Sequence, residues 1–213
     1  MDTFAVLTGD IVKSREITPR SRLIDALKET LETVKDAHRA EYDLYRGDSF
    51  QLVLPSAPSA ALVAVIIRSG LKSRSPKNGE TWDARISIGI GDITYRGESV
   101  SESDGPAFLL SGQGMDKLGS TNRRLIIEAP WEHADRSLSL VTRFADDLIS
   151  HWSRYSAETA FLSLVYNESQ SVLAERLGKR QSTINGRIAT ARLELIRAYV
   201  EHVMEYIHWE MQA

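Results

Sequence analysis

The 213-residue sequence contains no cysteine, which excludes disulfide bonds, thiol catalysis and cysteine-ligated zinc. It also lacks any run near the roughly 18 consecutive apolar residues of a membrane span. Asp10 and Lys13 interrupt the early apolar stretch, unlike a signal peptide. Glycine and proline are sparse, at 13 and 6 residues, and 42% of the residues are hydrophobic. This composition excludes disordered and collagen-like chains, and we expect a folded cytoplasmic protein with no membrane partner.

No excess of basic charge marks the whole chain as a nucleic-acid binder, because its formal net charge is −3. The charge is nevertheless unevenly distributed. Residues 167–199 hold six Lys and Arg against three Asp and Glu, a local excess of +3, whereas residues 200–213 hold three Glu and no basic residue. The acidic total therefore leaves room for phosphate contacts in one segment.

The first 130 residues alternate between strand and helix patterns. Apolar runs and β-branched alternation predict strands, and apolar residues spaced by three and four predict helices. We expect strands over 4–8, 42–46, 49–54, 85–90 and 125–127. Helices are expected from just after Pro19 to Val34, over 60–67, and from 106 to 118. The order is β-α-β-β-α-β with an added α-β, which is the split βαβ arrangement of ferredoxin-like folds.

After Pro130 the strand patterns end. Helices are predicted there over 138–152, 156–166, 170–177 and 182–207. Earlier in the chain, the polar stretch 70–79 is predicted to be turns. We therefore predict the α+β class, with a βαββαβ sheet domain over residues 1–132 and an all-α domain over residues 133–213.

Two Gly-Asp pairs follow predicted strands, at Gly9-Asp10 and Gly47-Asp48. In a βαββ unit the first strand lies beside the hairpin, so both aspartates are expected at one cleft. Two neighbouring carboxylates repel each other unless a cation lies between them, and Mg²⁺ favours such oxygen ligands. Gly47 would let the backbone approach a phosphate closely. Gly-Asp is also common in ordinary turns, so a turn without a ligand is the alternative.

These segments resemble the nucleotidyl cyclase superfamily, meaning class III adenylate and guanylate cyclases and their GGDEF relatives. Residues 4–12 resemble the first strand with its metal-binding aspartate, 46–50 the hairpin with the second, 86–91 a later core strand, and 105–108 the start of the next helix. The resemblance covers roughly residues 3–128. It implies a cyclase-like domain with metal ligands Asp10 and Asp48, and nucleotide contacts from Gly9, Ile11, Arg46 and Gly47.

Three positions depart from the cyclase pattern. The superfamily's transition-state Asn and Arg correspond here to Leu109 and Gln113, and its base-selecting Lys corresponds to Leu44. Electrostatic stabilisation is usually the largest catalytic contribution, so these losses argue against ordinary cyclase turnover. The resemblance therefore predicts a degenerate domain that retains nucleotide or phosphate binding.

Residues 170–188 resemble a bacterial helix-turn-helix. Leu173, Ala174 and Leu177 form one apolar face, Gly178 ends the first helix, and Ile184 begins the apolar face of the second. In this motif the start of the second helix enters the DNA major groove. The residues expected to meet phosphates and base edges are Lys179, Arg180, Gln181, Ser182, Thr183, Asn185 and Arg187. A helix pair that binds no ligand is the alternative.

The combination of a cyclase-like first half with a helix-turn-helix resembles bacterial SatD-family proteins, including the stretch 103–108. The main hypothesis is a cytoplasmic DNA-binding regulator that binds a nucleotide and Mg²⁺. The alternatives are an active nucleotidyltransferase or cyclase, and a non-enzymatic interaction scaffold. The apolar stripe from Leu193 to Ile207 is either core or the contact surface of a homodimer.

Overall fold

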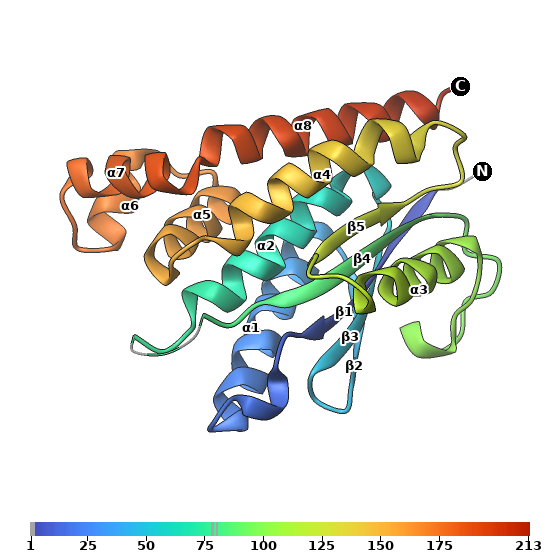
Figure 1. The fold of residues 1–213 in the computed structure, drawn as a ribbon, viewed down its shortest axis with the longest axis horizontal. Coiled ribbons are helices and arrows are strands. Elements are labelled where there is room, and N and C mark those ends of the chain that lie inside the picture. Colours follow the sequence, from blue (N-terminus) through green and yellow to red (C-terminus); the bar gives the residue numbers. More distant parts are fainter. Residues whose placement is uncertain (1–2, 78, 80) are drawn as a thin grey trace.

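The computed structural model describes residues 3–77, 79 and 81–213 (Figure 1). It confirms the predicted α+β class. The strands are β1 (Phe4–Ile11), β2 (Glu41–Tyr45), β3 (Ser49–Leu54), β4 (Ala84–Gly91) and β5 (Leu125–Glu128). The helices are α1 (Arg20–His38), α2 (Ala60–Ser73), α3 (Pro106–Gly119), α4 (Ala134–Ser150), α5 (Arg154–Tyr166), α6 (Gln170–Arg176), α7 (Gln181–Ala191) and α8 (Leu193–Glu210), with short 3₁₀ turns at Ser14–Glu16, Ala57–Ser59 and Val100–Glu102.

The five strands form one sheet in the order β2-β3-β1-β4-β5. β1 lies at the centre, antiparallel to both β3 and β4, and β5 runs parallel to β4 after the crossover through α3. The β1 register places Asp10 opposite Ser49 of β3 and Arg85 of β4. Because alternate residues share a face, Thr8 and Asp10 lie on one face and Leu7 and Ile11 on the other.

Helix α3 covers the face of the sheet that carries Thr8, and two glycines allow it to approach closely. A Cβ atom on Gly89 would lie 2.2 Å from the Ala107 carbonyl oxygen, and one on Gly114 would lie 2.1 Å from the Ser87 hydroxyl. Gly114 lowers helix propensity in the sequence pattern. Its function in the fold is to let α3 pack on β4.

The opposite face of the sheet packs against α1 and α2, and α2 is in turn covered by the C-terminal helices (Figure 1). Nearly every residue of α2 is buried, including Arg68 and Lys72. A helix that is apolar on all sides is expected in the interior of a protein. α2 therefore forms a central layer between the sheet and helices α4, α5 and α8.

One continuous hydrophobic core joins the two halves of the sequence. Residues such as Leu138, Phe161 and Ile196 belong to the same buried cluster as Leu7 of β1 and Ile66 of α2. The proposed boundary between residues 132 and 133 falls between β5 and α4, and the core extends across it. A separate small cluster of Leu173, Ala174 and Ile184 holds α6 against α7.

Two predicted helices differ most from the structure. The helix expected over 182–207 is two helices, because Arg192 adopts a left-handed conformation with φ of 50° between α7 and α8. The helix expected to end at residue 67 continues to Ser73, and part of the segment expected to form turns is therefore helical and places Lys72 in the interior.

No helix in the described ranges is long and apolar enough to span a membrane.

Candidate functional site

The carboxylate of Asp10, near the end of β1, is bound by an arginine from the neighbouring strand. Arg85 Nε donates to Oδ1 at 2.9 Å and Nη2 donates to Oδ2 at 2.5 Å. The Asp10 side chain is about one-quarter exposed and the Arg85 side chain about one-third exposed. The hydrogen bonds to Asp10 raise the pKa of the Arg85 guanidinium. This bidentate pair therefore neutralises Asp10 without a metal ion.

The second aspartate follows a tight turn. Arg46 and Gly47 both have positive φ, 51° and 81°, and the Asp48 N–H donates to the Tyr45 carbonyl at 3.2 Å. Positive φ at both central positions is the geometry of turns that favour glycine. The Ile11 N–H donates to the Asp48 carbonyl at 2.9 Å. The structure thus places the hairpin directly beside the end of β1, as the sequence pattern predicts.

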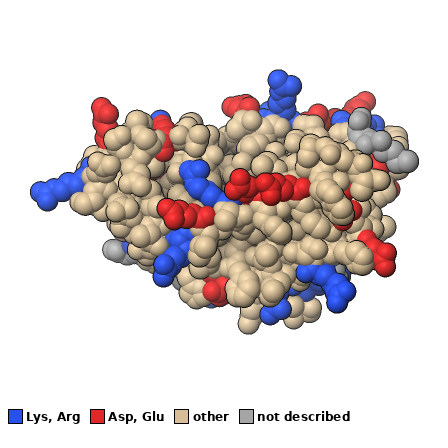
Figure 2. All heavy atoms as spheres, turned by 90° about the horizontal axis from the view of Figure 1, so that it is seen from above, with Lys and Arg blue, Asp and Glu red and all other residues tan. Residues whose placement is uncertain are grey.

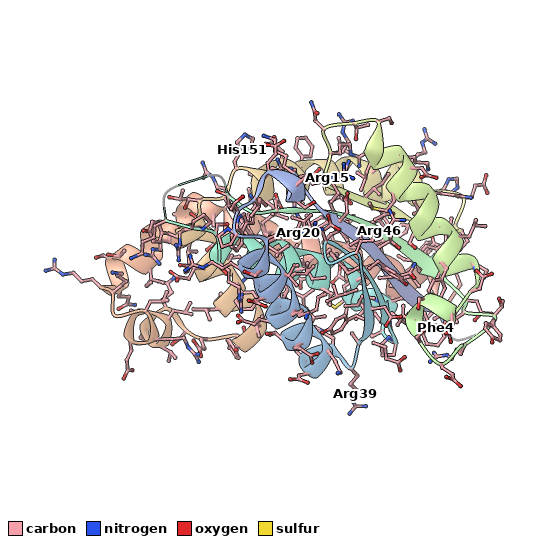
Figure 3. All side chains as sticks on the ribbon, turned by 90° about the horizontal axis from the view of Figure 1, so that it is seen from below. Phe4, Arg15, Arg20, Arg39, Arg46 and His151 are labelled. Carbon is pink, nitrogen blue, oxygen red and sulfur yellow. The ribbon has the colours of Figure 1, made fainter. Side chains whose placement is uncertain are left out.

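Asp48 is also held by groups from outside the hairpin. The Ser14 hydroxyl donates to its Oδ2 at 2.5 Å, and Arg20 Nη2 lies 3.3 Å from the same oxygen. Arg20 Nη2 additionally donates to the Arg46 carbonyl at 3.0 Å. We call Asp10, Ser14, Arg20, Arg46, Asp48 and Arg85 the hairpin cluster. Figure 3 shows Arg15, Arg20 and Arg46 toward one end of α1, with Arg39 at the other end.

The hairpin cluster carries slightly more positive than negative charge. Arg20, Arg46 and Arg85 contribute +3, and Asp10 and Asp48 contribute −2, so the formal sum is +1. Arg15 and Arg46 are exposed, and the Arg20 side chain is 47% exposed. An exposed group of cations at the end of a strand suits an anionic ligand.

The two aspartates as placed do not fit a Mg²⁺ site made by protein ligands alone. Their carboxylates suit Mg²⁺ chemically, but each already accepts hydrogen bonds or an ion pair from Arg85, Ser14 or Arg20. Within the described ranges, no group of three or more His, Asp or Glu residues is arranged to hold an ion. Mg²⁺ at this position remains a prediction.

The two other nucleotide-contact predictions at the end of β1, Gly9 and Ile11, have evident packing roles. A Cβ atom on Gly9 would lie 2.4 Å from the Phe50 ring, so glycine is needed there for Phe50 to pack. The Ile11 side chain belongs to the main core, and its N–H is already bonded to Asp48. Arg46 and Gly47 are the members of the predicted set that lie in the exposed turn.

The residues predicted to contact DNA divide into two groups. Lys179, Arg180, Gln181, Ser182, Thr183 and Asn185 are all exposed, at the turn before α7 and in its first turns. Arg187 differs, because its Nη1 donates to Glu158 of α5 at 3.0 Å and its guanidinium lies 5.0 Å from the Tyr155 ring centre. Arg187 is only 13% exposed. It connects α7 to α5 in this structure.

Sequence reasoning did not identify a buried ionic network behind the site. Arg68 binds Asp83 through two hydrogen bonds of 2.9 Å and Asp146 through one of 2.7 Å. Lys72 and Arg124 also reach Asp83 Oδ2, at 3.2 and 2.7 Å. The only available signal was a pair of charged residues at the end of an apolar helical stretch. The partners come from segments far apart in the sequence, so spacing could not reveal them.

Comparisons with known proteins give only distant structural likenesses. No protein-family model matches the chain, and no curated protein matches it. The solved structures that resemble it include an active GGEEF domain of a diguanylate cyclase from Vibrio cholerae, with 14% identity and a TM-score of 0.45, covering 62% of this chain and 85% of that one.

Two further similar structures are nucleotide cyclases. One is a dimeric guanylyl cyclase domain of the RhoGC fusion protein from the fungus Blastocladiella emersonii, with 21% identity, a TM-score of 0.41, and coverage of 53% and 72%. The other is a bacterial light-regulated adenylyl cyclase, with 14% identity, a TM-score of 0.40, and coverage of 59% and 74%. These likenesses are too weak to assign an activity to this chain.

Proposed function

We propose that this chain binds the phosphates of a nucleotide at the hairpin cluster. The observation that carries the proposal is that three arginines lie at the adjoining ends of β1, β4 and the hairpin. There Arg85 binds Asp10, and Arg20 binds Asp48 and the Arg46 carbonyl. Arginine presents several donors in a rigid fork that matches phosphate geometry. The three guanidinium groups outnumber the two carboxylates, and Arg46 is exposed at the turn.

Calorimetric titration of the full chain with ATP and with GTP tests the proposal, each with and without Mg²⁺. We expect Arg20→Ala to weaken binding about tenfold, which corresponds to about 1.4 kcal/mol, since it removes one charged contact. Lys35→Ala is the matched control, because Lys35 is an exposed cation in the last turn of the same helix. Absence of binding by either nucleotide under both conditions would contradict the proposal.

The Mg²⁺ arm separates nucleotide binding from the predicted metal site. If Asp10 and Asp48 hold Mg²⁺ next to the phosphates, Asp10→Asn is expected to abolish the Mg²⁺-dependent part of the affinity. A product assay with the same nucleotides tests the active-cyclase alternative. That alternative has to operate with Leu109, which is 62% exposed on α3, in place of the superfamily's Asn.

DNA binding by α6 and α7 is the second candidate function. It is favoured by the exposed polar row at the start of α7, held in place by the packing of Leu173 and Ala174 against Ile184. The face seen in Figure 2 carries no continuous basic patch, with acidic side chains near its middle. Contact with DNA is therefore not expected across the middle of this face.

Selection of bound sequences from a random duplex library, followed by affinity measurement at fixed salt, tests this candidate. Asn185→Ala is expected to relax sequence preference, and Lys179→Ala is expected to weaken binding to all sequences and to reduce its salt dependence. Lys28→Ala, at an exposed position of α1, is the charge-matched control. Failure to enrich any sequence, with affinity unchanged in both α7-end variants, would remove DNA from the proposal. An effect of added nucleotide on DNA affinity would connect the two candidates in one regulator.

A further inference from the structure

A cavity lies between the outer side of α4 and the segment that leads into β5. It has a volume of about 570 Å³ and is lined at one side by Asn122, Arg123 and Arg124. Arg143, Phe144 and His151 line the other side. None of the six residues of the hairpin cluster lines it. It is therefore a site separate from that of the proposed function.

The cavity contains arginine donors that the protein leaves unused. Arg143 is exposed and has no hydrogen bond or ion pair to any described residue. Arg123 Nε is buried without a partner among the described residues, and its Nη2 reaches only the Leu125 carbonyl, at 3.4 Å. A buried donor without an acceptor is costly, and a ligand acceptor would relieve that cost.

The charged groups around the cavity sum to a positive value. Asp146 is already bound by Arg68 and by the Arg124 backbone N–H, at 2.7 and 2.8 Å. Asp147 is exposed and lies 3.6 Å from His151. The count includes the charged residues that line the cavity and the buried ionic network that adjoins it. The positive charges are Arg68, Lys72, Arg123, Arg124 and Arg143, and the negative charges are Asp83, Asp146 and Asp147, so the sum is +2 with neutral histidine. The wall is partly buried, so this charge is less screened than at an open surface.

An apolar platform lies at the edge of the same cavity. Phe144 and Leu140 of α4 are 65% and 55% exposed, which is unusual for large apolar side chains, and both line the cavity. An exposed aromatic ring beside arginines suits a planar base with a phosphate attached. The volume lies within the range of small-molecule sites.

We infer that this cavity binds a nucleotide, with the base against Phe144 and the phosphate on Arg143 and Arg123. Arg124 closes the inner end of the cavity, where its Nη1 binds Asp83 at 2.7 Å. The Asp83 carbonyl in turn accepts the Val12 N–H, at 2.9 Å. Arg124 and Asp83 therefore connect the proposed nucleotide site to Val12, in the segment that follows Asp10.

The test is calorimetric titration of the full chain with AMP, with GMP and with inorganic phosphate. Arg143→Ala is expected to weaken all three about tenfold. Phe144→Ala is expected to weaken AMP and GMP several-fold and to leave phosphate unchanged, because only the base contacts the ring. Both side chains are exposed, so circular dichroism should show both variants folded. Arg124 is not varied, since its loss would leave Asp83 with fewer partners.

Two controls distinguish this site from the hairpin cluster. Arg136→Ala removes an exposed cation elsewhere on α4 and is expected to leave binding unchanged. Arg20→Ala is also expected to leave AMP binding at this cavity unchanged, whatever its effect on ATP. The inference is overturned if AMP and GMP do not bind, or if Arg143→Ala and Phe144→Ala leave their affinity unaltered. It is also overturned if Phe144→Ala only dissociates a dimer, measured by light scattering, without a change in nucleotide affinity.

Discussion

Two arginine–aspartate pairs in this protein have nearly the same geometry and opposite surroundings. Arg68 and Arg85 each donate from Nε and Nη2 to the two oxygens of Asp83 and Asp10, respectively. The Arg68–Asp83 pair is at most 1% exposed, whereas Arg85 and Asp10 are 33% and 26% exposed. The comparison shows that hydrogen-bond geometry alone does not define what an ion pair does. Burial determines whether the pair supports the fold or remains available to a ligand.

The buried pair depends on its further partners. Burial by itself raises the pKa of Asp83, but Arg68, Lys72 and Arg124 outweigh that effect and hold the pKa well below its usual range. Burial also lowers the pKa of Lys72, against the attraction of Asp83. Removing one partner from such a network leaves an uncompensated charge in the interior. The exposed pair carries no such penalty, because water replaces a lost partner.

The largest expected difference between the pairs is in stability. Arg68→Met is expected to lower the free energy of unfolding by about 3–5 kcal/mol, and Arg85→Met by about 0–1 kcal/mol. Urea unfolding followed by circular dichroism measures both. Asp146→Asn offers a milder second variant if Arg68→Met does not fold. Equal losses at the two positions would break the comparison.

Acid is expected to act through the buried pair. Because the native pKa of Asp83 is lowered, its contribution to stability is complete above the unfolded-state pKa of about 3.9. That contribution is lost as the pH falls further, toward the native pKa. Unfolding measured from pH 6 to pH 2 should show this loss, and Asp83→Asn should show a weaker pH dependence from a lower starting stability. If Asp83→Asn has the same pH profile of stability as the natural sequence, groups other than Asp83 cause the acid sensitivity.

The smallest expected stability change is at Asp10, where the effect should appear in binding. Asp10→Asn is expected to change the free energy of unfolding by less than about 1 kcal/mol, as for other exposed pairs. In Mg²⁺-free buffer it is expected to tighten ATP binding a few-fold, since it removes a negative charge and frees Arg85. Calorimetry measures the affinity, with Asp36→Asn at an exposed position of α1 as the control. Weaker binding in Mg²⁺-free buffer would show that the Asp10 carboxylate itself supports the ligand.

The sequence pattern was informative wherever a single segment carried the information. Period-two and helical spacing located the strands and most helices, and the two Gly-Asp pairs predicted that β1 and the hairpin would meet. Patterns within a segment did not show where a helix breaks, because Arg192 between α7 and α8 is not a typical helix terminator. They also made Gly114 appear unfavourable, since its advantage lies in contact with Ser87, on another element.

The candidate sites show the same division. Asp10 and Asp48 are visible as a motif, whereas Arg85, Arg20 and Ser14, which bind their carboxylates, lie on three other segments and match no pattern. The cavity beside α4 combines residues from before β5 with residues one and two turns apart on a helix. Neither set has a spacing that propensity or periodicity could detect.

The sequence by itself determined the α+β class, the positions of most elements and the meeting of β1 and the hairpin at one end of the sheet. These follow from local conformational preference and apolar periodicity, which depend on neighbours along the chain. Only the tertiary structure decided that arginines hold Asp10 and Asp48, that α2 buries Arg68 and Lys72, and that one core joins both halves. The physical reason is that charge pairing and burial depend on distance in space, which folding sets between residues far apart in sequence.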